Sequence, residues 1–196
     1  MSELHPLVIL LAAVLTNNIL LNNFLGLCSF LACGRQLDTA VGLGIAVIFV
    51  TFCTTVINYL IYHGILVPLQ LEHLQFIIFI AVIAGFVQLV ELIIGRFSPT
   101  LYYHLGIFLP LITVNCAILG ASLFMIIRNY SFWQSAAWGL GAGTGWALAI
   151  CLMAGIQQRL RFSAIPKPLQ GLAITMIVTG LMALAFMGFT GMAKIQ

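Results

Sequence analysis

The sequence is 196 residues long, and its composition excludes most classes of protein. Hydrophobic residues make up 63% of it, whereas soluble domains contain about 45–50%. Lys, Arg, Asp and Glu together make up 6%, too few to cover a water-soluble surface, and disordered chains need the opposite composition. The net charge of +3, without a dense basic patch, also excludes nucleic acid as a partner. These numbers predict a membrane protein whose solvent is the lipid bilayer.

Six apolar segments are long enough to cross a bilayer as helices, which takes about 20 residues each. They are residues 7–21 with a continuation to 32, 39–65, 74–94, 101–127, 132–156 and 169–192. The segments are continuously apolar and do not alternate with polar residues, so we expect helices and not strands of a β-barrel. The sequence therefore predicts an all-α integral membrane protein in which residues 1–196 form a single polytopic domain.

Basic residues predict the orientation, because cytoplasmic loops are richer in Lys and Arg. The loops after the first, third and fifth segments carry Arg35, Arg96, Arg159, Arg161 and Lys167. The opposite side carries only Arg128 and Lys194. This distribution predicts that both termini lie outside the cytoplasm.

The two halves of the chain share a short repeat. The triplet at residues 16–18, Thr-Asn-Asn, precedes Gly-Leu-Gly at 42–44 by 26 residues, and Thr-Val-Asn at 113–115 precedes Gly-Leu-Gly at 139–141 by the same distance. The halves, approximately residues 1–97 and 98–196, each contain three segments. A three-helix unit repeated in tandem is inverted the second time, which predicts two inverted three-helix repeats, as in many transporters.

Polar residues and breakers interrupt the first and fourth segments. The first contains Asn17, Asn18, Asn22, Asn23 and Gly26, and the fourth contains Pro110, Thr113, Asn115 and Gly120. Proline removes a backbone donor, and asparagine in lipid needs a partner within the protein. We expect both segments to be broken or half-spanning helices that meet near the middle of the membrane. The alternative is two kinked helices held together by polar contacts.

The five cysteines, at positions 28, 33, 53, 116 and 151, form no C-x-x-C pair, and their odd number does not indicate a disulfide framework. Cys28 and Cys116 differ from the others because each lies beside the polar and glycine residues of an interrupted segment. Aligning one on the other gives an offset of 88 residues between the halves, against 97 for the asparagine triplets. Two thiols do not complete a zinc or iron–sulfur site, so composition alone favours apolar buried thiols.

Glu91 is the acidic residue that lies deep within a predicted span. An intramembrane carboxylate is a candidate for an ion path, and Gln88 lies on the same helical face. The alternative is that Glu91 reaches water at the end of the helix, near Arg96.

Two further patterns indicate packing and membrane anchoring. Aromatic residues expected at the membrane–water interface are Tyr102, Tyr103, Trp133 and Trp138. A stripe of small residues consists of Gly139, Gly141, Gly143 and Gly145. Such a stripe permits close helix packing, either within the fold or against another protein of the membrane.

Three stretches, residues 22–28, 105–116 and 179–187, resemble the RnfA/NqrE family of six-span bacterial membrane subunits. The family serves two ion-translocating complexes, the Rnf complex and the sodium-pumping NADH:quinone oxidoreductase. The resemblance implies a [2Fe–2S] cluster shared with a paralogous six-helix subunit, with two cysteines from each. The positions that match the family's ligands are Cys28 and Cys116. Polar or small residues expected around the cluster are Asn22, Gly26, Thr113 and Asn115.

The resemblance also implies a function: a subunit of the bacterial inner membrane that relays electrons and couples them to transport of Na⁺ or H⁺. Flavin-bearing and iron–sulfur subunits of the same complex would be its partners, since the chain has no G-x-G-x-x-G motif for a dinucleotide. Residues 16–18, 98–99 and 187–189 favour the Rnf type, whereas residues 130–132 and 145–146 are closer to NqrE. Other classes remain open, namely a secondary transporter without a redox centre and a structural scaffold.

Overall fold

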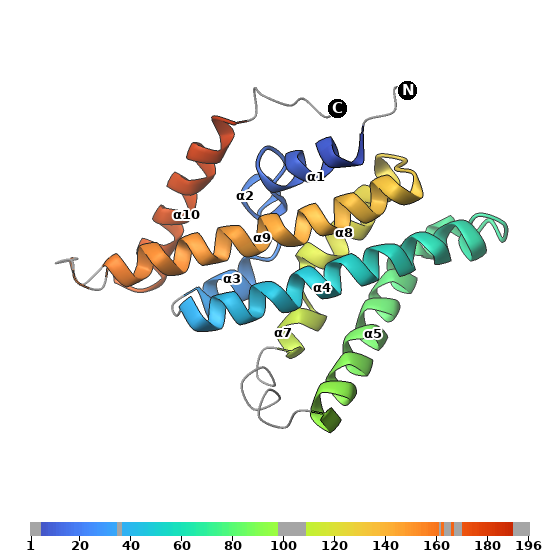
Figure 1. Cartoon of the computed structure of the whole chain (residues 1–196), viewed down its shortest axis with the longest axis horizontal. Coiled ribbons are helices and arrows are strands. Elements are labelled where there is room, and N and C mark those ends of the chain that lie inside the picture. Colours follow the sequence, from blue (N-terminus) through green and yellow to red (C-terminus); the bar gives the residue numbers. More distant parts are fainter. Residues whose placement is uncertain are drawn as a thin grey trace.

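The computed structural model describes residues 5–34, 37–97, 109–160, 162, 166 and 170–189. The regular elements in these ranges are all helical (Figure 1). They are α1 (Pro6–Val14), α2 (Ile19–Asn23), α3 (Leu27–Cys33), α4 (Leu37–Ile61), η1 (Tyr62–Leu66), η2 (Glu72–Leu74), α5 (Gln75–Phe97), α7 (Leu109–Thr113), α8 (Cys116–Ile127), α9 (Phe132–Leu160) and α10 (Leu172–Met187). No strand occurs in the described residues, which confirms the all-α class.

Four helical stretches in the described ranges are long and apolar enough to cross a membrane. They are Leu37–Leu66, Gln75–Ile93, Pro110–Ile127 and Phe132–Leu160. They agree with the second to fifth predicted segments, whereas the first segment forms three short helices and α10, in the sixth, has 16 residues. The helices fit a protein of the membrane interior, while the count of six spans and the inverted repeat stay predictions.

Two long helices, α4 and α9, run antiparallel side by side, and most of the other helices pack against one or both of them (Figure 1). Glycines of the predicted stripe allow this close approach. A Cβ added to Gly143 would lie 2.9 Å from the Ile48 Cα, and one added to Gly139 would lie 3.0 Å from the Thr55 side chain. Side chains larger than glycine would therefore force α4 and α9 apart.

The glycine stripe of α9 also packs closely against α1. A Cβ on Gly141 would lie 2.6 Å from the Ala13 Cβ and 2.9 Å from the Leu10 carbonyl oxygen, both in α1. One on Gly145 would lie 3.0 Å from the Ala13 carbonyl oxygen. Of the two roles that the sequence left open for this stripe, the structure shows packing within the fold.

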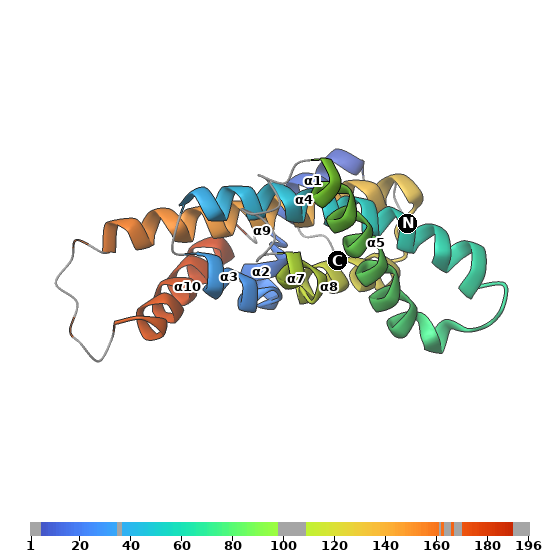
Figure 2. The same cartoon turned by 90° about the horizontal axis from the view of Figure 1, so that it is seen from below.

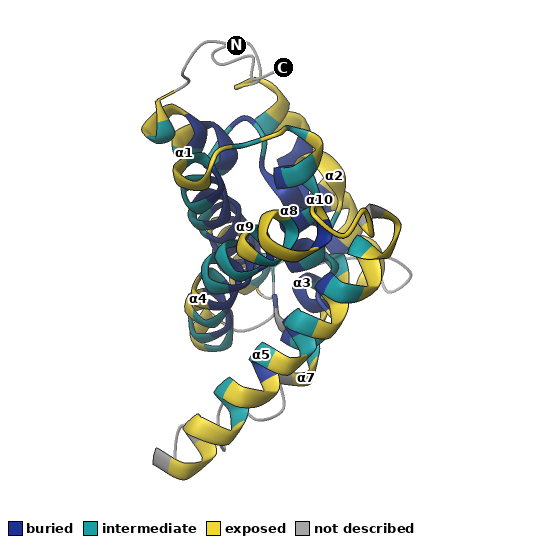
Figure 3. Cartoon of the chain, turned by 90° about the vertical axis from the view of Figure 1, so that its right-hand side faces the viewer, coloured by how far each residue is buried: buried dark blue, intermediate teal, exposed yellow. Residues whose placement is uncertain are grey.

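The short helices form a second layer. Figure 2 shows α2, α3, α7 and α8 together beside the α4/α9 pair, between α10 and α5. The helix α5 projects from the core with a mainly exposed surface (Figure 3), and 17% of its most apolar stretch is buried, against 56% for α9. Its outward apolar side chains suit contact with lipid or with another membrane protein.

The expectation that Trp138 belongs to an interfacial aromatic belt is wrong. Trp138 is buried, and its indole N–H donates to the Ala121 carbonyl at 3.0 Å. The turn between α8 and α9 places the Arg128 guanidinium 4.9 Å from its ring centre, a cation–π contact. Trp133 is 72% exposed, as expected for a belt residue, and Tyr102 and Tyr103 lie outside the described residues.

The glycine packing predicts that Gly141→Ala destabilises the chain whereas Gly155→Ala does not. Both positions are in α9, but a Cβ on Gly155 would meet nothing within 4 Å. Overpacking at Gly141 is expected to cost roughly 1–3 kcal/mol, while alanine in an open helical position is favourable by up to about 1 kcal/mol. Melting temperatures of the two purified variants in detergent test this, and equal values would contradict the packing described above.

Candidate functional site at the two helix breaks

Asn18 stabilises the first of two breaks in the first predicted segment. Asn18 caps α2, and its side-chain oxygen accepts hydrogen bonds from the N–H groups of Leu20 at 3.1 Å and Leu21 at 3.4 Å. Its amide donates to the Gly145 carbonyl of α9 at 2.7 Å. The side chain thus replaces backbone partners that the break removes and joins the break to the central helix.

A second interruption follows within ten residues. Phe24 and Gly26 both have left-handed backbone, with φ of 55° and 84°. The chain therefore turns sharply and begins a new helix, α3, of which Cys28 is the second residue. The polar and glycine residues of the first predicted span thus interrupt it twice, and the span becomes three helices.

The fourth predicted segment breaks once, between α7 and α8. Asn115 caps α8, and its side-chain oxygen accepts a hydrogen bond from the Ala117 N–H at 3.0 Å. Cys116 is the first residue of α8. Both candidate cysteines therefore lie in the first turn of a helix that begins at a break.

The two breaks meet. The backbone N–H of Gly26 donates to the Cys116 sulfur at 2.9 Å, across 90 residues of sequence. A Cβ on Gly26 would lie 2.5 Å from the Trp146 Nε1 and 3.0 Å from the Asn115 Oδ1. Only glycine fits this junction, both for its left-handed φ and for the space that Trp146 and Asn115 leave.

Two buried N–H donors at this junction lack a hydrogen-bond partner within the described residues. They are the Asn115 Nδ2 and the Trp146 Nε1. Unpaired buried donors are rare in native proteins, and each is explained by strain, by a functional role or by a bound water, ion or ligand. Together with the Gly26 N–H and the amino end of α8, they make the surroundings of Cys116 favourable for negative charge.

The site is open on one side. Cys28 is exposed and Cys116 is partly buried, and Val114, next to the α8 cap, is 72% exposed. Within the described ranges, no three side chains of His, Cys, Asp or Glu gather in one place. The described part of the chain thus offers one exposed and one partly buried thiol at this site, and a four-ligand metal site needs further ligands from elsewhere.

The other predicted residues have different surroundings. Asn22 is exposed, and its amide donates to the Thr16 carbonyl at 3.0 Å, across the first break. Thr113 is the last residue of α7 and is partly buried. Cys53 and Cys151 are partly buried on α4 and α9. Cys33 is the last residue of α3.

Glu91 lies on α5, away from the helix breaks in sequence, and is partly buried. It lines a surface hollow with Gln88, Leu92, Gly95 and Arg96. The hollow agrees with the predicted common face of Gln88 and Glu91. Whether the carboxylate serves an ion path or reaches water beside Arg96 stays a prediction.

Trp146 belongs to the site although the sequence analysis did not predict it. Its position directly after the glycine stripe does not indicate that its ring reaches the break of a distant segment. The sequence indicates Asn18 as an interruption of the first segment, and the structure shows that it also joins the break to α9 through Gly145. A polar residue in a span is visible in the sequence, but its partner is fixed by the tertiary fold.

Known proteins resemble this chain over nearly its whole length. The model of a family described as "Rnf-Nqr subunit, membrane protein" matches residues 7–193. The chain is 48% identical over 199 residues to the E subunit of the Na(+)-translocating NADH-quinone reductase of Pseudoalteromonas translucida, covering 96% of this chain and 98% of that one. It is 50% identical over 184 residues to the A subunit of the Na(+)-translocating ferredoxin:NAD(+) oxidoreductase complex of Acetobacterium woodii, covering 94% and 96%.

The junction predicts that Gly26→Ala destabilises the chain whereas Gly42→Ala does not. Gly26 has a left-handed φ of 84°, and a Cβ there would lie 2.5 Å from the Trp146 Nε1, whereas a Cβ on Gly42, within α4, would meet nothing within 4 Å. Gly26→Ala is expected to cost about 1–2 kcal/mol in backbone conformation and a further overpacking cost of roughly 1–3 kcal/mol. Thermal unfolding in detergent measures the difference. Equal losses of stability would mean that the two breaks do not meet at Gly26.

Proposed function

The chain belongs to the Rnf-Nqr family of membrane subunits, and from this premise we propose that it relays electrons in an ion-translocating oxidoreductase complex of the bacterial inner membrane. The observation that carries the proposal is the meeting of the two helix breaks, where the Gly26 N–H donates to the Cys116 sulfur. A chain so poor in ionisable groups is suited to hold a redox centre inside the bilayer, and poorly suited to acid–base chemistry.

The residues at the junction fit half of the ligand set of a [2Fe–2S] cluster. Cys28 and Cys116 would supply two of the four thiolates, and a paralogous six-helix subunit would supply the other two against the open face. When bound, such a cluster accepts and donates one electron at a time. The two unpaired donors, Asn115 Nδ2 and Trp146 Nε1, support this fit because cluster sulfurs accept hydrogen bonds.

This chain would contribute electrostatic stabilisation as well as ligands. Negative charge is costly in the low dielectric of a membrane, and fixed N–H donors reduce that cost. The Gly26 N–H already donates to the Cys116 sulfur, and the amino end of α8 adds a partial positive charge. These groups are held rigidly by the Asn115 cap and by packing on α9, so little reorganisation is needed when the charge changes.

The arrangement of the helices supports the proposed inverted repeat. In each half, a broken segment is followed by a long helix and then by a peripheral one. The two long helices, α4 and α9, are antiparallel, and the peripheral helices α5 and α10 lie at opposite ends of the molecule (Figure 2). Two inverted repeats would place Cys28 and Cys116 near a shared axis at the middle of the membrane, with both termini in the periplasm.

Relatives of both complexes match at nearly equal identity, so the choice between them rests on shorter stretches. Residues 16–18, 98–99 and 187–189 favour the Rnf type, which transfers electrons between ferredoxin and NAD⁺. The names of both relatives support Na⁺ as the transported ion. Flavin-bearing and iron–sulfur subunits of the complex would exchange electrons with the site.

The ligand assignment predicts that Cys28→Ser and Cys116→Ser each abolish the iron of one [2Fe–2S] cluster and the turnover of the assembled complex. Matched controls are Cys53→Ser and Cys151→Ser, which change partly buried thiols of α4 and α9 outside the junction. Iron content and the EPR signal of purified complex measure the result. Wild-type iron and turnover in either of the first two variants would refute the assignment and favour a scaffold.

Iron analysis also separates the proposal from a secondary transporter of the same fold. Purified with its paralogue, the chain is expected to retain iron and acid-labile sulfide in equal amounts, because a [2Fe–2S] cluster contains both. A pair free of iron that still transported its ion would establish the transporter instead.

The Rnf-type assignment predicts a specific electron acceptor. Membranes that contain the complex are expected to reduce NAD⁺ with reduced ferredoxin, and Cys116→Ser is expected to abolish that rate. Absorbance of NADH follows the reaction. The opposite result has two parts: wild-type membranes show no ferredoxin-dependent rate, and Cys116→Ser abolishes their reduction of quinone by NADH. That result would assign the chain to the NADH–quinone reductase.

A further inference from the structure

Helix α9 carries two fully buried tryptophans whose indole N–H groups have different surroundings. The Trp138 Nε1 donates to the Ala121 carbonyl at 3.0 Å. The Trp146 Nε1, about two turns further along the helix, is buried without a hydrogen-bond partner in the described residues. A buried indole N–H usually has a partner, so the orientation of the Trp146 ring needs another explanation.

The polar edge of Trp146 lies against Gly26, at the start of α3. A Cβ built on Gly26 would lie 2.5 Å from the Trp146 Nε1, too close for a real side chain. The indole therefore takes the space that a side chain at residue 26 would fill. This contact joins the central helix α9 to the second interruption of the first predicted segment.

Gly26 is also held by its own backbone groups. Its carbonyl accepts hydrogen bonds from the Ser29 hydroxyl at 3.1 Å and the Phe30 N–H at 3.2 Å, both in α3. Its N–H donates to the Cys116 sulfur at 2.9 Å. Because Trp146 blocks movement of Gly26 in the direction of the missing Cβ, the N–H keeps its direction toward the sulfur.

The part of α9 that carries Trp146 is itself fixed against the first predicted segment. The Gly145 carbonyl accepts a hydrogen bond from the Asn18 amide at 2.7 Å, and a Cβ on Gly145 would lie 3.0 Å from the Ala13 carbonyl oxygen. Asn18 caps one end of α2, and Gly26 lies just beyond the other end. Two consecutive residues of α9 thus hold the chain on both sides of α2.

We infer that Trp146 is a positioning residue of the redox site: by packing against Gly26 it keeps the Gly26 N–H directed at the Cys116 sulfur, and so stabilises an added electron there. The inference rests on the proposed electron-relay function, and it assigns to that function a residue that acts through Gly26. Hydrogen bonds to sulfur are among the features that set the reduction potential of an iron–sulfur cluster. An N–H donor favours the more negative, reduced form, so a loosened Gly26 lowers the potential.

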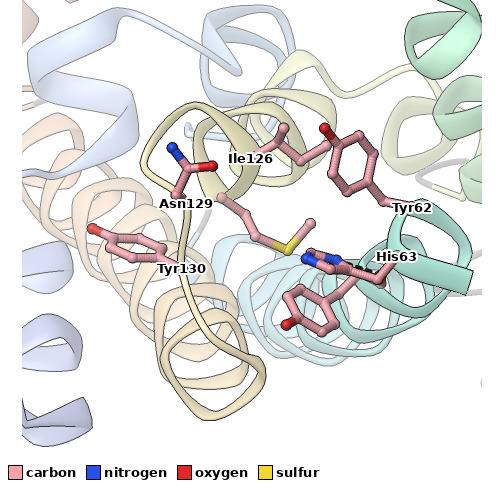
Figure 4. Close-up of a pocket in the computed structure, with 7 residues that line it drawn as sticks. Tyr62, His63, Ile126, Asn129 and Tyr130 are labelled. Atoms are coloured by element: carbon pink, nitrogen blue, oxygen red, sulfur yellow. Dashed lines mark hydrogen bonds between the residues drawn. The ribbon is translucent and has the colours of Figure 1, made fainter. Parts of the chain in front are cut away.

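Trp138 offers a matched control, because it is buried on the same helix but bonds to Ala121 and not to the junction. It lies about 12 Å from Trp146 along the helix axis. Its ring centre is 6.0 Å from that of Tyr130, which lines a cavity of about 80 Å³. Figure 4 shows Tyr130 at one edge of this cavity, opposite Tyr62 and His63. The lining of the cavity contains no residue of the junction.

Trp146→Phe tests the inference, because it removes the Nε1 edge that lies against Gly26 and keeps an aromatic ring on α9. At the wild-type midpoint potential, the ratio of reduced to oxidised cluster in the purified complex is expected to fall roughly 10-fold. This is the effect of weakening one hydrogen bond to a charged group, and it equals about 59 mV for one electron. A redox titration followed by EPR measures the ratio.

Trp138→Phe is expected to leave the midpoint potential unchanged, although it removes an indole hydrogen bond. A purely structural role of Trp146 predicts that both variants melt at lower temperature with the wild-type potential. An unchanged potential in Trp146→Phe, at wild-type iron content, would therefore overturn the inference.

A second measurement does not depend on iron. Gly26→Ala is expected to lower the melting temperature of the full chain in detergent less in the Trp146→Phe background than in wild type, because phenylalanine lacks the atom nearest to the added Cβ. In the Trp138→Phe background the loss is expected to equal that in wild type. Equal losses in all three backgrounds would overturn the inference even where a variant holds no iron. Absence of iron from the wild-type complex would refute the proposed function itself, whereas an unchanged potential at wild-type iron refutes only the role of Trp146.

Discussion

Asparagine side chains that replace backbone hydrogen bonds are the interaction on which the rest of this structure depends. A helix broken inside a membrane leaves N–H and C=O groups without partners, and lipid offers none. Asn18 and Asn115 each cap the helix that follows a break, through their side-chain oxygens. Each cap stabilises its break by roughly 0.5–2 kcal/mol, and it is at these breaks that Cys116 and Gly26 come together.

Close packing on α9 holds the two capped breaks in place relative to each other. The glycine stripe allows α1 and α4 to approach the helix at van der Waals distance, and the Gly145 carbonyl accepts a hydrogen bond from Asn18. Trp146, the next residue, lies against Gly26 and limits that position to glycine. The same helix thus supports the fold, positions the first break and places an N–H donor against Gly26, the residue that donates to the Cys116 sulfur.

The sequence was sufficient to predict what depends on local composition. The apolar segments 39–65, 74–94 and 132–156 agree closely with α4, α5 and α9, and the polar interruptions agree with the helix breaks. Features that are set by tertiary contacts could not be predicted from the sequence. Trp138 looks like an interfacial aromatic in sequence, yet the α8–α9 turn buries it beneath Arg128. The role of Trp146 and the hydrogen bond between Asn58 and Ser122 likewise depend on how distant helices pack.

The central claim is that two helix breaks place Cys28 and Cys116 on one open face as half of a ligand set. A cryo-EM map of the assembled complex, at a resolution that separates side chains, tests it most directly. We predict metal–sulfide density that joins Cys28 and Cys116 to two cysteines of a neighbouring paralogous subunit near the middle of the membrane. Cysteine side chains that face lipid or pack against apolar residues, with no density between the two proteins, would contradict it.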